Sequence, residues 1–151
     1  MDKGILNTRV VAQVGIIVKD IEKTAKKFAD FFGMEMPEIS ITDTYDKALT
    51  QYKGQPSEAR SKLAFFHMDN GLDIELIEPD DKPSTWREFL DTHGEGMHHI
   101  AFVIEGMQDK IDKLSDKGMT VIQKGEYTGG RYAYVDATDD LKMIIELLEN
   151  D

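Results

Sequence analysis

Residues 94–104 read GEGMHHIAFVI, and this stretch decides the fold. Two histidines open an apolar run rich in β-branched and aromatic residues, a pattern typical of a half-buried strand. Successive side chains on a strand point to opposite faces of the sheet. We therefore expect only one of His98 and His99 to face a site.

A second stretch near the N-terminus indicates which histidine faces inward. Residues 11–18, VAQVGIIV, align with residues 97–104, MHHIAFVI, and Gln13 then falls on His99. The alignment makes His99 the inward residue and leaves His98 as a packing or supporting histidine. Gly15, in the middle of the first stretch, indicates a close approach of backbone or ligand.

A second pair of matching segments follows in the same order. Residues 74–78, IELIE, match residues 145–149, IELLE, and place Glu75 on Glu146. Two matches in the same order, each aligning one candidate ligand with another, predict a chain built from two copies of one unit. The last glutamate of each segment is out of step with the inward face, so we expect Glu78 and Glu149 to face solvent.

The local patterns fill in a βαβββ order for each unit. The expected elements are strand 9–18, helix 21–32, hairpin strands 62–68 and 72–78, a linker helix at about 83–93, helix 107–117, and strands 119–123, 131–136 and 141–149. Residues 34–52 are ambiguous, with one or two strands and a loop, and residues 54–58 read as a surface loop.

These elements predict one α+β domain over residues 1–151, with module 1 at about 9–79 and module 2 at about 96–150. Each unit is too small to close a core alone, so the two should join in a curved mixed sheet around a metal-binding cleft.

Composition narrows the classes of partner. The chain has 151 residues, 40% of them hydrophobic, no cysteine and a formal net charge of −11. The charge argues against nucleic acid and anionic membrane as partners. With no long apolar run or targeting pattern, we expect a cytoplasmic protein. An anionic substrate would need a basic patch, for which the candidates are Arg60, Lys62, Lys124 and Arg131.

The duplicated strands aim four polar groups at one point, namely Gln13, Glu75, His99 and Glu146. Two carboxylates, an imidazole and an amide form a mainly oxygen-donor site for a divalent cation such as Co, Zn, Ni, Mn or Fe(II). Each residue alone has a simpler interpretation, a solvent-facing glutamate or a hydrogen-bonded amide. Together they favour a metal site, because a buried carboxylate without a partner costs several kcal/mol.

The chain resembles the vicinal oxygen chelate superfamily, which includes glyoxalase I, methylmalonyl-CoA epimerase, extradiol dioxygenases and bleomycin-resistance proteins. Residues 96–102, GMHHIAF, resemble the epimerase "G-x-H-H-I-A" strand, residues 128–130 its Gly-Gly turn, and residues 145–147 its closing "I-E-L". The resemblance covers nearly the whole chain. It implies two βαβββ units, metal ligands at the four positions named above, and a homodimer.

Three departures separate this chain from the epimerases. Most of them have histidine at the position of Gln13, a "His-Pro" after the strand that here ends at Ala137, and in some cases a carboxylate base near Ala64 or Phe65. Gln, Glu, His and Glu is also a quartet of some glyoxalase I enzymes. An iron dioxygenase ranks low, because Gln13 removes one of the two histidines of its triad.

The resemblance implies an enzyme that moves a proton next to a metal-bound carbonyl, with an acyl-CoA thioester or a thiol adduct as substrate. We expect Glu146 to be the base and Glu75 its counterpart on the other face. Methylmalonyl-CoA epimerisation is the leading reaction, and glyoxalase I-type lyase chemistry is the alternative. A non-catalytic binding protein of the resistance type would not need two inward carboxylates.

Overall fold

The structure, a computed structural model, describes residues 2–151. The first part of the chain forms β1 (Gln13–Ile17), α1 (Ile21–Phe32), β2 (Ser40–Ile41), α2 (Tyr45–Ala48), β3 (Gln51–Tyr52), β4 (Gln55–Pro56), β5 (Ser61–His67) and β6 (Asp73–Pro79). The helix α3 (Thr85–His93) follows. The second part forms β7 (Gly96–Val103), α4 (Met107–Ser115), β8 (Thr120–Tyr127), β9 (Gly130–Ala137), α5 (Thr138–Leu141) and β10 (Met143–Asn150). Among the described residues no helix has the length and apolar character needed to cross a bilayer.

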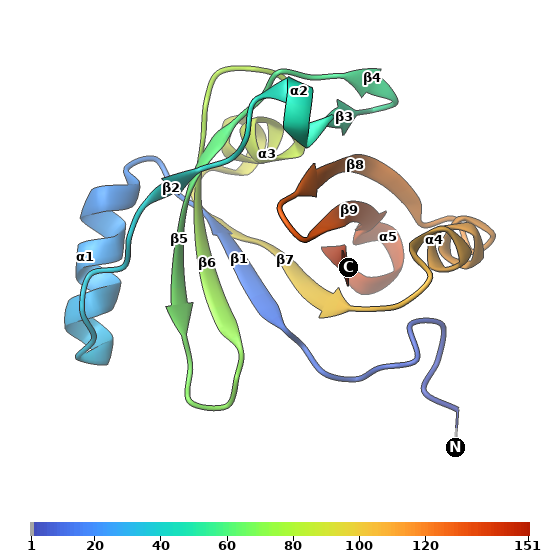
Figure 1. The fold of residues 1–151 in the computed structure, drawn as a ribbon, viewed down its shortest axis with the longest axis horizontal. Helices are drawn as coiled ribbons and strands as arrows, with labels where there is room; N and C mark the ends of the chain where they lie inside the picture. The colour runs from blue at the N-terminus through green and yellow to red at the C-terminus, as the bar shows by residue number, and fades with distance from the viewer. Residues whose placement is uncertain (1) are drawn as a thin grey trace.

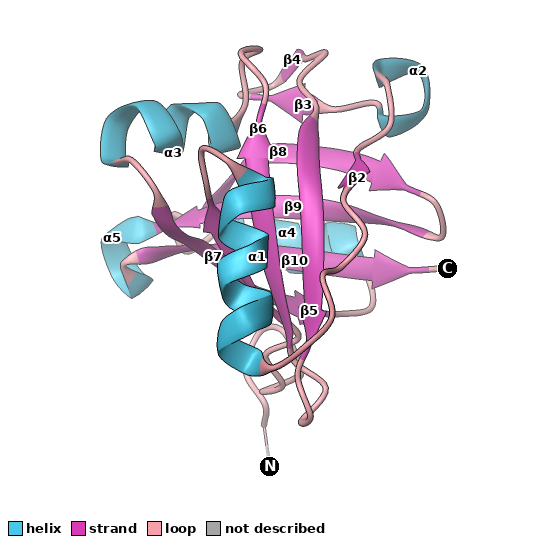
Figure 2. Cartoon of the chain, turned by 90° about the vertical axis from the view of Figure 1, so that its left-hand side faces the viewer, coloured by secondary structure: helices cyan, strands magenta, loops and turns pink. Residues whose placement is uncertain are grey.

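All ten strands belong to one curved mixed sheet in the order β2-β5-β6-β1-β7-β10-β9-β8-β3-β4. The segment β2-β5-β6-β1 repeats as β8-β9-β10-β7, and the two copies meet where β1 pairs antiparallel with β7. Within each copy the first and last strands are parallel neighbours, β1 with β6 and β7 with β10. The sheet curls so that β8, β9 and β10 run across and behind β5 and β6 (Figure 2). The predicted α+β fold of two βαβββ units is confirmed.

Each copy has its own apolar core between its long helix and the outer face of the sheet (Figure 1). In the first copy, Ile21, Ala25 and Ala29 of α1 are buried, because a spacing of four residues keeps them on one face of the helix. Leu76 on β6 and Leu147 on β10 are fully buried in the two cores. Since side chains alternate along a strand, the residue before each leucine points to the opposite, concave face.

The last glutamate of each repeated IELxE segment binds the first turn of its own unit's helix. Glu78 accepts a hydrogen bond from the Ile21 amide at 3.0 Å, and Glu149 accepts one from the Met107 amide at 3.1 Å. The first amides of a helix have no partner within the helix, and the helix dipole favours a negative charge there. Both glutamates point away from the inward face, as expected, but they are half-buried against a helix instead of lying free in solvent. Their contacts are a further sign of the duplication.

Residues 42–60 extend away from the sheet of the first copy and contact the second copy. The hairpin of β3 and β4 pairs with β8, with Gln51 opposite Lys124 and Tyr52 opposite Gln123 (Figure 1). The expected surface loop at 54–58 contains the short strand β4, and Ser57 is buried. This excursion therefore covers one end of the space between the two halves of the sheet.

Candidate metal centre

Two rows of three paired residues cross the central strands of the sheet. One row runs from β6 through β1 to β7, and the other runs from β1 through β7 to β10. In the first row Gly15 on β1 lies between Glu75 on β6 and His99 on β7. In the second row Ala101 on β7 lies between Gln13 on β1 and Glu146 on β10. Gly15 and Ala101 correspond in the repeat, so each unit places a small residue between two polar ones.

The residue between Glu75 and His99 must be small, because the His99 imidazole lies against the backbone of Gly15. A Cβ atom at Gly15 would lie 2.0 Å from Cε1 of His99, far inside contact distance. The His99 ring therefore lies directly over the backbone of β1. This is the close approach that the position of Gly15 in the strand predicted, and a side chain rather than a ligand fills the space.

Three donor atoms converge where the two rows meet. His99 Nε2 lies 3.1 Å from Glu146 Oε1 and 3.6 Å from Glu75 Oε1. The three side chains belong to residues that are 2%, 5% and 7% exposed. Ligand atoms about 2.1 Å from one ion lie roughly 3–4 Å from each other, so these separations suit a shared cation.

None of these three atoms has a hydrogen-bond partner among the described residues. A buried polar atom without a partner costs about 1–3 kcal/mol, and more when it is charged. Burial, followed by the nearby charge of Glu146, raises the pKa of Glu75 well above its ordinary value. A divalent cation would satisfy all three atoms and remove the repulsion between the carboxylates, so the donor set fits a metal ion.

Gln13, the fourth predicted ligand, lines the same cavity as the two glutamates. It is half-buried and lies across from Ala101, whose small side chain leaves the space above β7 open. The structure therefore brings Glu75, His99 and Glu146 into one cluster and places Gln13 on the wall of the cavity that the two glutamates also line.

A β-bulge in β7 brings His98 into contact with His99. Gly15 pairs with His99 while its neighbour Ile16 pairs with Met97, so His98 is the extra residue on β7. The bulge turns the His98 ring until its Nδ1 lies 2.8 Å from His99 Nδ1. The two histidines therefore do not point to opposite faces as the simple alternation predicted. His98 instead supports His99 directly.

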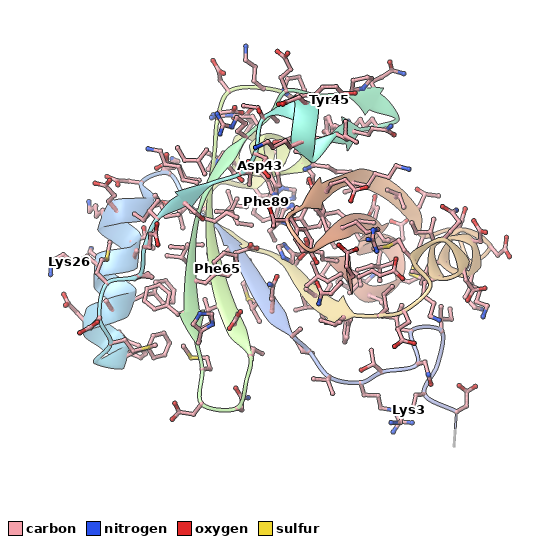
Figure 3. All side chains as sticks on the ribbon, viewed as in Figure 1. Lys3, Lys26, Asp43, Tyr45, Phe65 and Phe89 are labelled. Atoms are coloured by element: carbon pink, nitrogen blue, oxygen red, sulfur yellow. The ribbon has the colours of Figure 1, made fainter. Side chains whose placement is uncertain are left out.

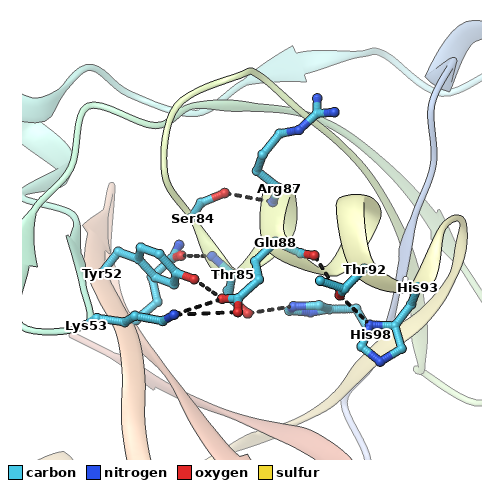
Figure 4. Close-up of polar contacts among 10 residues, drawn as sticks. Tyr52, Lys53, Ser84, Thr85, Arg87, Glu88, Thr92, His93 and His98 are labelled. Atoms are coloured by element: carbon cyan, nitrogen blue, oxygen red, sulfur yellow. Dashed lines mark hydrogen bonds and ion pairs between the residues drawn. The ribbon is translucent and has the colours of Figure 1, made fainter.

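The His98 contact determines which nitrogen of His99 can bind a cation. His98 Nε2 lies 3.1 Å from the hydroxyl of Thr85, the first residue of α3 (Figure 4). Burial, and then the neighbouring His99, lower the pKa of His98 well below its ordinary value, so its ring is neutral. If His99 Nε2 offers its lone pair, His99 Nδ1–H donates to His98 Nδ1, and His98 Nε2–H donates to Thr85.

The network continues to the cavity wall through residues that sequence reasoning missed. The Thr85 amide donates to Oε1 of the buried Gln123 at 2.8 Å, and Gln123 Nε2 donates to the Tyr132 hydroxyl at 3.1 Å. Tyr134 lies on β9, as Tyr132 does, and its hydroxyl accepts a hydrogen bond from Trp86 Nε1. The centre of the Tyr134 ring lies 5.0 Å from that of the His99 ring. The alternation of tyrosines on β9 was the one available signal, since it places both on the same face.

The donors open into a cavity of about 550 Å³ between the two halves of the sheet. Its apolar walls come from both copies and include Leu63, Phe65, Trp86, Tyr132 and Tyr134. Figure 3 shows Phe65 on β5, on the side that faces the second half, with Asp43 above it on the segment after β2. A cavity of this size suits a small organic ligand.

The four basic residues proposed for substrate binding do not line this cavity. Arg60 Nε donates to the backbone oxygen of Thr42, and Lys62 pairs with Glu78. Lys124 and Arg131 line a separate hollow between α4 and β8. Arg131 is bound there by Glu149 and Asp151.

Comparison with known proteins gives the same fold. The model of the glyoxalase/bleomycin resistance protein/dioxygenase superfamily matches residues 12–135. An uncharacterized protein of Bacillus subtilis (strain 168), YqjC, is 30% identical over 95 residues, which are 61% of this chain and 67% of that protein.

Solved structures of methylmalonyl-CoA epimerases share the architecture at low sequence identity. The enzyme of Mycobacterium tuberculosis has a TM-score of 0.66 and 19% identity, with 100% of this chain and 93% of that chain covered. A variant of the Streptomyces coelicolor enzyme in complex with 2-nitronate-propionyl-CoA has a TM-score of 0.61 and 20% identity, with 93% and 96% covered. The chain therefore belongs to the glyoxalase/bleomycin resistance protein/dioxygenase superfamily.

Proposed function

We propose that the protein is a divalent-metal-dependent isomerase that moves a proton on a carbon next to a carbonyl group. The observation that carries the proposal is the cluster of buried, unpartnered donor atoms of Glu75, His99 and Glu146 at the cavity. Epimerisation of methylmalonyl-CoA is the first reaction to consider, because similarly folded proteins are epimerases of that substrate.

The metal would be held by Glu75, His99 and Glu146, with the amide oxygen of Gln13 as a fourth donor. Co, Zn, Ni and Mn all accept such a mixture of oxygen and imidazole ligands. The two carboxylates balance the charge of a divalent ion, and four protein ligands leave one or two coordination positions for a substrate. When bound, the ion would polarise a carbonyl oxygen and so acidify the neighbouring C–H bond.

Glu146 is our candidate for the base, with Glu75 as its counterpart. The two glutamates belong to β10 and β6, which lie on opposite sides of the central pair β1 and β7. In an epimerisation one carboxylate takes the proton from one face of the carbon, and a protonated carboxyl returns a proton to the other face. The bulged His98 and the α3 network keep the His99 ring fixed while this happens.

A second candidate reaction is the isomerisation of a thiol hemithioacetal, the chemistry of glyoxalase I. The observation that favours it is on β5, where Leu63 and Phe65 line the cavity and no carboxylate does. Some epimerases carry a base in this part of the strand. In the glyoxalase reaction the proton returns to the adjacent carbon, so one carboxylate can both remove and return it.

Deuterium exchange separates these reactions from each other and from simple binding. The metal-loaded protein is incubated in D₂O with methylmalonyl-CoA or with the methylglyoxal–thiol adduct, and NMR measures deuterium at the reacting carbon. We expect the native protein to catalyse deuterium exchange into one of these two substrates. The exchange should be lost in Glu146→Gln and retained in Glu105→Gln, which removes an exposed carboxylate outside the cavity. Exchange that persists in Glu146→Gln would refute its role as base. Light scattering will test the predicted homodimer.

A further inference from the structure

The cavity has a one-sided distribution of charge. Its walls carry five carboxylates, and no lysine or arginine among the described residues lines it. Two of the five are the buried Glu75 and Glu146, which a divalent cation would neutralise. The other three are Asp43, Asp73 and Glu126, which are half-buried or exposed and so lie nearer to solvent.

The charges of these three outer carboxylates are only partly compensated. Asp73 shares a hydrogen bond with Nδ1 of the exposed His67. Glu126 lies 3.9 Å from Arg131 Nε, but that guanidinium also binds Glu149 and Asp151. Asp43 lines the cavity, and no ion pair within 4.0 Å joins it to a cationic group of residues 2–151.

The aromatic side chains that line the cavity also favour a positively charged ligand. Phe65, Trp86, Tyr127, Tyr132 and Tyr134 surround the cavity with aromatic side chains. The face of an aromatic ring carries negative potential and attracts organic cations. Burial raises the pKa of Tyr132 and Tyr134, so these phenols stay uncharged and cannot repel a ligand.

We propose that the part of the substrate enclosed by this cavity is positively charged or uncharged, and that the outer carboxylates, chiefly Asp43, reject substrates carrying a carboxylate or phosphate there. The inference rests on the proposed function, because it takes the inner glutamates as neutralised by a metal ion. Like charges placed together at an interface disfavour a ligand strongly. A methylmalonyl thioester is compatible with this selection only when its free carboxylate is directed at the metal ion and not at Asp43.

Three synthetic ligands of equal shape test this selection. Benzohydroxamic acids offer two adjacent oxygens to a metal, and their para position can carry trimethylammonium, tert-butyl or sulfonate. Trp86 is the single tryptophan of the chain and lines the cavity, so its fluorescence reports binding both with and without added Co(II). We expect the trimethylammonium ligand to bind at least about tenfold more tightly than the sulfonate, with the tert-butyl ligand between them.

Charge-removing variants assign the effect to the cavity. In Asp43→Asn the ratio between the cationic and anionic ligands should fall about threefold or more at low ionic strength. Glu105→Gln makes the same change of charge on an exposed residue outside the cavity and should leave the ratio unchanged.

The outcomes separate this inference from the proposed function. Uptake of Co(II) together with equal or tighter binding of the sulfonate would overturn the charge selection and leave the metal site intact. A preference for the cationic ligand without any uptake of Co(II) would contradict the metal-dependent function instead, and the charge selection would then stand only if the preference still falls in Asp43→Asn. An equal loss of preference in Asp43→Asn and Glu105→Gln would show that only net charge matters and would overturn the assignment to the cavity.

Discussion

Gly15 and His99 face each other across β1 and β7, and the imidazole occupies the space that any larger residue at position 15 would need. The same ring carries the nitrogen that meets both buried glutamates. A backbone position in the first unit therefore determines where the histidine of the second unit can lie. The candidate metal centre is built from residues of both copies.

The substitution Gly15→Ala tests this dependence. The added methyl group clashes with the His99 ring, and overpacking of this kind typically costs about 1–3 kcal/mol. Urea unfolding of the metal-free protein should show this loss of stability. In the background of His99→Ala the same substitution should cost much less, because the clashing ring is gone. Equal costs in the two backgrounds would mean that the contact does not constrain the site.

The contact between His98 and His99 predicts an effect on metal affinity. His98→Phe keeps a buried ring but removes both hydrogen bonds, and the loss of such a supporting partner typically lowers metal affinity about 10–100-fold. Isothermal titration with Zn or Co measures the change, and Thr85→Val should give a smaller loss in the same direction. His93→Phe, at an exposed position, is the matched control and should bind normally. Unchanged affinity in His98→Phe would rule out a supporting role.

The raised pKa of Glu75 predicts how the stability of the metal-free protein depends on pH. A carboxyl whose pKa is higher in the folded than in the unfolded protein holds more protons in the folded state between the two pKa values. Stability should therefore fall as the pH rises above the ordinary value of 4.5 and through the raised pKa. Thermal unfolding should show this slope in a chelator-treated sample, and Glu75→Gln should flatten it. A slope that is the same in both proteins would assign the pH dependence to other groups.

The sequence predicted the two halves of the sheet because repetition constrains them together. Side chains alternate along a strand, so one strand alone does not show which set of side chains faces inward. The alignment of the two copies places Gln13 with His99 and Glu75 with Glu146 and so identifies the inward set. The leucines after the two glutamates then fall into the apolar cores. The inward direction of both carboxylates could thus be predicted without any knowledge of their partners.

Other parts of the site depend on contacts that no local pattern encodes. The strands β3 and β4 have two residues each and exist because β8 lies beside them. The bulge at His98 depends on the register with β1, which a single strand does not reveal. The basic residues were chosen by charge alone, whereas Asp73 on β6 and Asp43 on the segment after β2 line the cavity and none of the four basic residues does.

The most direct test of the account is the metal content of the purified protein. After equilibration with Co(II) or Zn and removal of free ions, elemental analysis should find about one divalent ion per chain. The double variant Glu75→Gln, Glu146→Gln should retain the fold by circular dichroism and bind much less metal. A native chain that takes up no divalent ion under these conditions would contradict the account, because three buried donor atoms would then lack the partner that explains them.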